Sequence, residues 1–149
     1  MASSMPVEEV FPSTDLVVVV PCSQAKAERP APAADLYTGP YHRQCRRAAE
    51  ALTATGGRWL ILSGLHGLVT PDTRLAPYEH RFGKDGSITP ERLREQATVL
   101  GIAEAQQVVV LAGRTYAQAA QQVWPHAHTP LVGIGGIGRQ RARLAEIIR

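Results

Sequence analysis

The chain has 149 residues, of which 44% are hydrophobic, and this length and composition predict one globular domain with an ordinary apolar core. No apolar run approaches the roughly 20 residues of a membrane-spanning helix, and the first fifteen residues lack the basic-then-apolar order of a secretion signal. The 16 lysines and arginines exceed the 13 aspartates and glutamates, so the formal net charge of +3 permits a phosphate or nucleic-acid partner without demanding one.

The predicted elements alternate between strands and helices. Residues 1–14 show no periodicity and predict a flexible tail, and residues 15–149 predict a single α/β domain. Strands are predicted from short apolar runs at residues 16–20, 59–63 and 108–111. Helices are predicted at residues 41–54, 90–100, 114–123 and 139–148. We therefore expect a three-layer domain with a mostly parallel, Rossmann-like sheet of about four to five strands.

A glycine-rich segment, residues 131–137, is interpreted as a short fourth strand that runs into a turn before the last helix. Such a turn either exposes backbone N–H groups to an anion or simply lets the helix dock. Two long connections, residues 25–40 and 65–89, begin at carboxyl ends of strands, and loops of this length in a compact domain favour a functional role.

The first strand is followed by Cys22, Ser23 and Lys26. Ligands of open α/β sheets bind in the crevice outside the carboxyl ends of the strands, so these residues predict one wall of a site. A thiol near an ammonium group or a helix start can act as a nucleophile. The alternative is that Cys22 is a small buried residue and Lys26 a solvated one.

Tyr37, Thr38 and Gly39 come directly before the second predicted element, a helix that begins near Pro40. Thr38 suits a helix cap or a turn, and Gly39 suits a tight backbone, so both have a structural explanation. Tyr37 has no such structural explanation. Because it lies beside a free helix N-terminus, it is a candidate to stack on a base.

The second strand ends with Ser63 and Gly64, followed by His66 between two glycines. A tight turn there would fix the imidazole as an acid or base near neutral pH, although His66 could equally cap the turn by hydrogen bonding. In the loop beyond, Tyr78 precedes Glu79, which is a candidate to orient His66 or to activate a water, or else to form a surface ion pair.

The third strand ends with Gly113, Arg114 and Tyr116, which repeat the pattern of a glycine at a strand end before a helix. Gly113 can admit a ligand close to the backbone, and Arg114 suits an anion.

The two cysteines, Cys22 and Cys45, match neither a zinc spacing nor a disulfide framework, which favours a reducing cytoplasm. His126 and His128 lack a third ligand, so we expect no metal. The glycines at 133, 135, 136 and 138 do not match the G-x-G-x-x-G fingerprint of a dinucleotide site, and we expect no cofactor.

The ordered motifs are C-S-Q-A-K at 22–26, L-Y-T-G-P-Y at 36–41, I-L-S-G-L-H-G-L at 61–68, A-P-Y-E at 76–79 and A-G-R-T-Y at 112–116. With them the chain resembles a family of small bacterial and phage proteins known mainly as a domain of unknown function. It is distantly similar to the YaaA-type peroxide-stress proteins and to the archaeosine synthase domain with a P-C-S-x-x-K-like motif. This resemblance implies a link to nucleic acids and to modified or 7-deazaguanine-type bases.

These observations lead to the hypothesis of an enzyme that acts on a nucleotide, nucleoside or nucleic-acid base by hydrolysis or exchange of a C–N bond of the N-glycosidic type. His66 or Glu79 would handle the proton, and Cys22 would attack or shape the pocket. The alternative is a non-catalytic module that binds DNA or RNA or serves a stress response. Two arginine clusters suit phosphate in either case, or are merely solvated helix faces: Arg43, Arg46 and Arg47, and Arg139, Arg141, Arg143 and Arg149.

Overall fold

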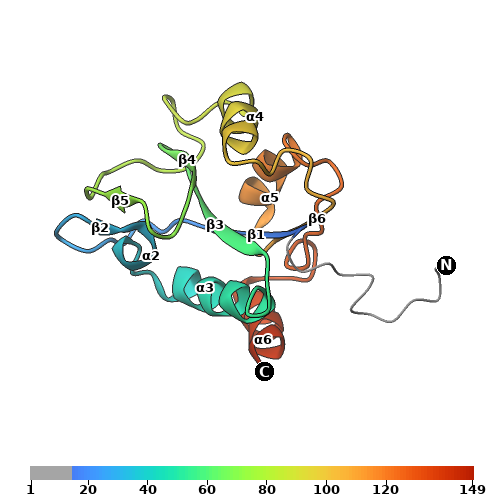
Figure 1. The fold of residues 1–149 in the computed structure, drawn as a ribbon. Coiled ribbons are helices and arrows are strands. Elements are labelled where there is room, and N and C mark those ends of the chain that lie inside the picture. Colours follow the sequence, from blue (N-terminus) through green and yellow to red (C-terminus); the bar gives the residue numbers. More distant parts are fainter. Residues whose placement is uncertain (1–14) are drawn as a thin grey trace.

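A four-stranded sheet forms the centre of the molecule in the computed structural model, which describes residues 15–149 (Figure 1). Its strand order is β4-β3-β1-β6. The central strand β1 (Leu16–Pro21) pairs in parallel with β3 (Arg58–Ser63) on one side and with β6 (Gln107–Val110) on the other. The three strands predicted from apolar runs are confirmed, with bounds that differ by about one residue. The predicted tail, residues 1–14, lies outside the described residues.

The fourth strand is not the predicted one. β4 (Gly67–Val69) turns back after β3 and pairs with it in antiparallel fashion. Residues 131–136 form turns and bends instead of a strand. Gly133 has a φ of 81° and Gly135 a φ of 122°, and these backbone conformations do not fit an extended strand. The prediction of a strand at residues 131–137 is therefore wrong.

Five helices accompany the sheet in the described residues: α2 (Ala33–Leu36), α3 (Pro40–Leu52), α4 (Pro90–Val99), α5 (Arg114–Gln121) and α6 (Ile137–Ile148). The four longer helices correspond to predicted ones, and α2 lies in a connection predicted to be irregular. The protein is thus a mixed α/β structure with a mostly parallel sheet.

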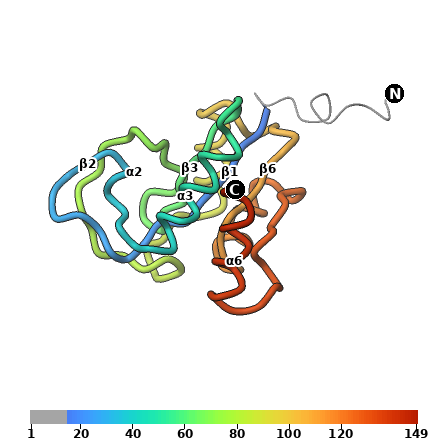
Figure 2. The backbone as a smooth tube through the Cα atoms, turned by 90° about the horizontal axis from the view of Figure 1, so that it is seen from below, coloured from blue at the N-terminus to red at the C-terminus, as the bar shows by residue number. Residues whose placement is uncertain are grey.

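The alternation of side chains along β1 explains why this strand is continuously apolar. Val17 and Val19 belong to a core cluster that includes residues of α4 and α5. Val18 and Val20 belong to a second cluster that includes residues of α3 and α6. Helices α3 and α6 pack against each other along one side of the sheet (Figures 1 and 2). Each face of the strand therefore needs apolar side chains.

The two long connections pair with each other instead of forming independent loops. β2 (Ala31–Pro32) and β5 (Arg74–Leu75) form a small antiparallel ladder next to α2 (Figure 1). Two further backbone hydrogen bonds, from the N–H groups of Ala33 and Ala34, join the same segments. This pairing places residues 31–34, in the middle of the first connection, against residues 71–75 of the second.

The start of α4 offers a test of local helix capping. The Oγ1 atom of Thr89 accepts a hydrogen bond of 3.2 Å from the N–H of Arg92, and Pro90 occupies the first helical turn. We expect Thr89→Ala to lower the free energy of unfolding by about 1 kcal/mol, because one N–H of the first turn loses its partner. Urea unfolding measures this change. Thr98→Ala, at an exposed position in the same helix, is the control, and an equal loss in both variants would contradict the capping role.

Candidate functional site

A cleft of about 610 Å³ lies at the carboxyl end of β1. Its walls come from five segments that are distant in the sequence. They are residues 21–24 after β1, residues 39–42 at the start of α3, residues 80–82, residues 113–116 at the start of α5, and Ile137 with Gln140 in α6. The ends of β1 and β6 thus contribute to one cleft, whereas the residues predicted at the end of β3 do not line it.

The amino-terminal ends of three helices meet at this cleft. The N-cap residues of α3, α5 and α6 are Gly39, Gly113 and Gly136, and none of the three helices has a side-chain cap at its N-cap position. The first turn of a helix carries N–H groups without intrahelical partners and a partial positive charge. Arg81 and Arg114 add two full positive charges, and no carboxylate is among the lining residues. The cleft is therefore suited to an anion.

Cys22 lies in this cleft with its thiol next to a phenol. Its Sγ atom is 3.3 Å from the Tyr116 hydroxyl, and its backbone N–H donates to the carbonyl oxygen of Leu62. The Tyr116 ring stacks on Phe82, with ring centroids 4.3 Å apart. Burial raises the pKa of Tyr116 above its usual range, so the phenol keeps its proton at neutral pH. A thiol and a protonated hydroxyl group thus stand side by side.

Ser23 holds the segment after β1 against the start of α3. Its Oγ atom donates a hydrogen bond of 2.7 Å to the carbonyl oxygen of Ala25 and accepts one of 3.2 Å from the N–H of Gly39. A Cβ atom on Gly39 would lie 2.9 Å from the Cβ of Ser23, which explains the glycine. Thr38 is not the helix cap, because α3 begins at Pro40 and its N-cap residue is Gly39. Its N–H instead bonds to Ala25.

His42 is a cleft residue that the sequence analysis did not select. Its side chain is 1% exposed, and Nδ1 lies 2.6 Å from the carbonyl oxygen of Pro21. The Nε2 atom is buried and has no hydrogen-bond partner among residues 15–149. The spacing of His42, Cys45 and Ala49 matches the buried face of α3, and this periodicity could have identified the histidine as an inward one.

Four other predicted residues come together beside the cleft, around the Tyr78 hydroxyl. The Oγ atom of Ser63 is 2.7 Å and the hydroxyl of Tyr37 is 2.6 Å from this oxygen. Because Ser63 Oγ already accepts from two backbone N–H groups, its own proton goes to Tyr78. Lys26 places its Nζ atom 4.4 Å from the centroid of the Tyr78 ring. The hydroxyl groups of Ser63, Tyr37 and Tyr78 form a hydrogen-bonded cluster with Lys26 against its rings, and none of the four residues lines the cleft.

The role predicted for Tyr37 does not fit its position. The side chain is 1% exposed, and its ring contacts Tyr78 edge-on and His42 at a tilt. No face of a ring that is buried to this degree is open to a base, so the stacking role is wrong for Tyr37. Phe82, which lies outside the set of predicted site residues, is a half-buried aromatic residue on the cleft wall, as are Tyr41 and Tyr116.

His66 and Glu79 are not brought together. The His66 ring packs against the edge of Tyr78 at 4.9 Å, and burial lowers its pKa, so the imidazole is neutral at neutral pH. Glu79 is exposed and makes no hydrogen bond or ion pair with the described residues. Neither side chain lines the main cleft, although Lys26, Tyr78 and Glu79 line a smaller pocket of about 240 Å³.

The connection after β5 supplies His80, Arg81 and Phe82 to the cleft. The Nε2 atom of His80 is 2.7 Å from the Oγ atom of Ser87, which closes this loop on itself. A Cβ atom on Gly64 would lie 2.8 Å from the Cα of Phe82, so the glycine lets the loop pack on the turn after β3. A basic and aromatic tripeptide inside a long loop is the signal that could have drawn attention to these residues.

Buried groups on α3 predict a loss of stability in alkali. Burial raises the pKa of the Cys45 thiol from its ordinary value near 9 to about 12. The folded protein therefore keeps a proton that the unfolded chain releases, and the free energy of unfolding falls as the pH rises between these two values, by up to about 1.4 kcal/mol per pH unit. Urea unfolding at several pH values measures the slope. Cys45→Ala should have a smaller slope, and an equal slope in both proteins would contradict this explanation.

In residues 15–149 no group of three or more histidine, cysteine, aspartate or glutamate side chains is arranged to hold a metal ion. None of the helices described is long and apolar enough to cross a membrane. Among known proteins, the model of a family of unknown function, DUF6884, matches residues 17–146 of the chain. Searches of curated proteins and of solved structures gave no match.

Proposed function

The chain belongs to the DUF6884 family, whose function is unknown, and from the geometry of its cleft we propose that it is an enzyme that acts on a nucleotide, nucleoside or nucleic-acid base. The observation that carries this proposal is the meeting of three helix amino termini with Arg81 and Arg114 around one cleft. This combination favours a phosphate group, because N–H donors and guanidinium groups both bind its oxygens.

The aromatic wall of the cleft supports the nucleotide part of the proposal. Phe82 and Tyr116 stack on each other within the cleft, next to the amino terminus of α5. A base that packs on Phe82 would place its sugar between this wall and the helix amino termini. A cleft of about 610 Å³ is in the usual range for small-molecule sites, so a mononucleotide is a suitable ligand.

For the reaction, we propose hydrolysis or exchange of a C–N bond of the N-glycosidic type. In hydrolysis the bond between the sugar carbon and the base nitrogen breaks, the nitrogen gains a proton, and the sugar carbon gains the hydroxyl of a water. Cys22 would position that water, the Tyr116 hydroxyl would give its proton to the leaving nitrogen, and the remaining proton of the water would restore the Tyr116 hydroxyl. If the Cys22 sulfur attacks the sugar carbon instead, the thiol proton goes to the leaving nitrogen, and the water then displaces the sulfur, which takes a proton from that water. We favour this pair over His66 and Glu79 because both of its members line the cleft.

The experiment is an incubation of the full chain with ribonucleoside and deoxyribonucleoside 5′-monophosphates, followed by chromatography for free base. Isothermal titration calorimetry gives the affinity for each compound and for the matching nucleosides. Release of base that is lost in Cys22→Ala but kept in Cys45→Ala would support the proposal, because the Cys45 thiol does not line the cleft. Binding without release of base from any compound would reject the C–N reaction, and absence of binding would reject the nucleotide site.

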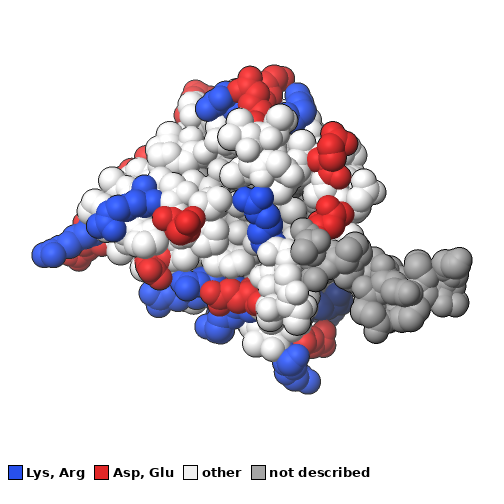
Figure 3. Space-filling model, in the orientation of Figure 1, with Lys and Arg blue, Asp and Glu red and all other residues white. Residues whose placement is uncertain are grey.

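A second candidate, a non-catalytic module that binds DNA or RNA, is favoured by exposed arginines on α3 and α6. Arg43, Arg47 and Arg139 are exposed and form no ion pair within residues 15–149. Basic side chains gather over α3 next to acidic ones in Figure 3. In this case affinity for a single-stranded oligonucleotide would fall steeply with salt, and no compound would be turned over. A three-layer, Rossmann-like fold stays a prediction in either case.

A further inference from the structure

The positive charge of the chain is concentrated on two neighbouring helices. Six arginines and two glutamates give α3 and α6 a combined net charge of +4, although the formal net charge of the whole chain is +3. The two helices lie side by side, and side-chain hydrogen bonds join Tyr41 to Gln140 and Gln44 to Arg141. Their exposed face is therefore a basic surface on a protein whose remaining part is slightly acidic.

Three exposed arginines of these helices form no hydrogen bond or ion pair through their side chains within the part of the chain that the structure describes, and we call them the arginine surface: Arg43, Arg47 and Arg139. The two glutamates of the helices do not neutralise them, because Glu50 pairs with Arg46 and Glu146 pairs with Arg143. Guanidinium groups without a partner are suited to phosphate oxygens. The arginine surface is therefore suited to a ligand that carries several phosphates.

The arginine surface begins at the edge of the cleft. Arg43 directly follows residues 39–42 of α3, and Arg139 directly precedes Gln140 of α6, and both of these neighbours line the cleft. Arg47 lies four residues beyond Arg43, which is about 6 Å further along the axis of α3 and away from the cleft. A chain of phosphates that leaves the cleft along these helices would therefore meet the arginines in turn.

We infer that the nucleotide in the cleft is part of a single strand of nucleic acid, and that the neighbouring phosphates of this strand bind Arg43, Arg47 and Arg139. This inference rests on the proposed function and makes its substrate a polynucleotide. A nucleic acid is favoured over an acidic protein because the cleft and the arginine surface are continuous, and one strand reaches both. A single strand is favoured over a duplex because a paired base enters a pocket only after it leaves the stack.

The test compares ligands of different length and strandedness. Calorimetry gives the affinities of the wild-type chain for the four nucleoside 5′-monophosphates, for a single strand of eight nucleotides that contains all four bases, and for the duplex of that strand. Ribo and deoxyribo forms are measured at several salt concentrations. We expect the single strand to bind at least about 100-fold more tightly than any mononucleotide, because its added phosphate contacts act within the same complex.

Variants show where the strand lies. The double variant Arg43→Gln with Arg47→Gln should weaken binding of the strand about 10- to 100-fold. It should also reduce the slope of log affinity against log salt by about 1.4, because two phosphate contacts are lost. Neither arginine lines the cleft, so mononucleotides should bind this variant as they bind the wild type. Arg114→Gln, within the cleft, should weaken binding of both the mononucleotide and the strand.

The charge-matched control is Arg92→Gln with Arg94→Gln, which removes two exposed arginines that form ion pairs on α4. An equal loss of strand affinity in this control would overturn the inference, because the effect would come from overall charge. So would an affinity for the duplex equal to that for the single strand, or a strand affinity that Arg114→Gln leaves unchanged.

Mononucleotide binding separates a failure of this inference from a failure of the proposed function. If mononucleotides bind and the strand binds no more than about eightfold more tightly, the number of nucleotides alone explains the gain. That result would overturn the inference and leave the proposed function intact. If the wild type binds neither the mononucleotides nor the strand, both fail.

Discussion

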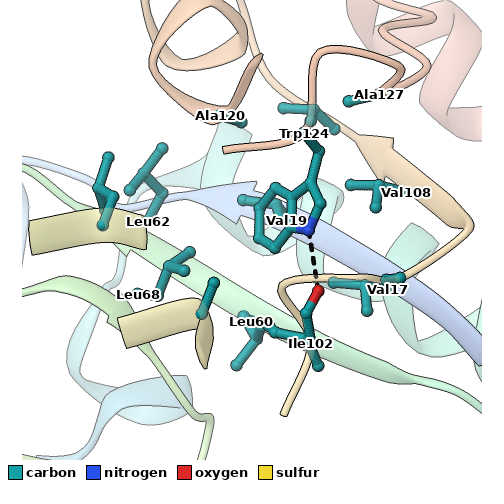
Figure 4. Packing of buried hydrophobic residues seen from close by; sticks show 14 of the residues in the cluster. Val17, Val19, Leu60, Leu62, Leu68, Ile102, Val108, Ala120, Trp124 and Ala127 are labelled. Atoms are coloured by element: carbon teal, nitrogen blue, oxygen red, sulfur yellow. Dashed lines mark hydrogen bonds between the residues drawn. The ribbon is translucent and has the colours of Figure 1, made fainter. Parts of the chain in front are cut away.

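Replacing Trp124 with alanine is expected to lower the free energy of unfolding by about 3–5 kcal/mol. The indole is fully buried, and its Nε1 atom donates a hydrogen bond of 2.9 Å to the carbonyl oxygen of Ile102. It packs against the face of the sheet that Val17 and Val19 line, as Figure 4 shows. The substitution removes this apolar contact and leaves a carbonyl without its donor. Domains of this size are stable by about 5–15 kcal/mol, so the loss is a large fraction.

A second variant of Trp124 separates the hydrogen bond of the indole from its packing, and a surface variant is the control. Trp124→Phe keeps an aromatic ring but removes the donor to Ile102, and we expect it to cost about 1–3 kcal/mol. Val99→Ala, at a position that is 86% exposed, should change stability by less than about 0.5 kcal/mol. Urea unfolding followed by circular dichroism measures all three. A loss in Trp124→Ala as small as that in Val99→Ala would show that the indole does not hold this side of the core.

The strands and the longer helices could be predicted because their signals are local. β1 is apolar along its whole length since Val17 and Val18 point into different core clusters. The short strand β4 gave no such signal, because three residues are too few to show a period. Residues 131–136 gave a false strand prediction. Their apolar side chains are typical of a strand, but Gly133 and Gly135 adopt conformations with positive φ. Composition alone does not reveal the φ of a glycine.

The candidate site was predictable mainly where it follows strand ends. Cys22 and Gly113 lie just beyond β1 and β6, and both line the cleft as the parallel arrangement implies. His66 also follows a strand, but the antiparallel turn into β4 directs it to Tyr78 and away from the cleft. Phe82 reaches the cleft through loop packing on Gly64, a contact between residues that no periodic pattern links.

Removing either arginine of the cleft should weaken nucleotide binding more than any other single change in charge. Arg81 and Arg114 are exposed, line the cleft, and form no hydrogen bond or ion pair through their side chains within residues 15–149. Their replacement therefore leaves the fold almost undisturbed. A hydrogen bond to a charged group is worth about 1.5–3 kcal/mol, so we expect Arg81→Gln or Arg114→Gln to weaken binding of adenosine 5′-monophosphate about 10- to 100-fold.

The affinity for adenosine, which lacks the phosphate, shows whether the arginines bind that group. If each guanidinium binds the phosphate, the variants should bind adenosine as the wild type does, because the lost contact does not exist in that complex. Arg92→Gln removes one charge from an exposed ion pair on α4, away from the cleft, and controls for the change in net charge. Equal weakening of the nucleotide and the nucleoside in Arg114→Gln would place the phosphate elsewhere. Weakening in Arg92→Gln of the same size would mean that the effect comes from overall charge, since a long-range field acts without contact.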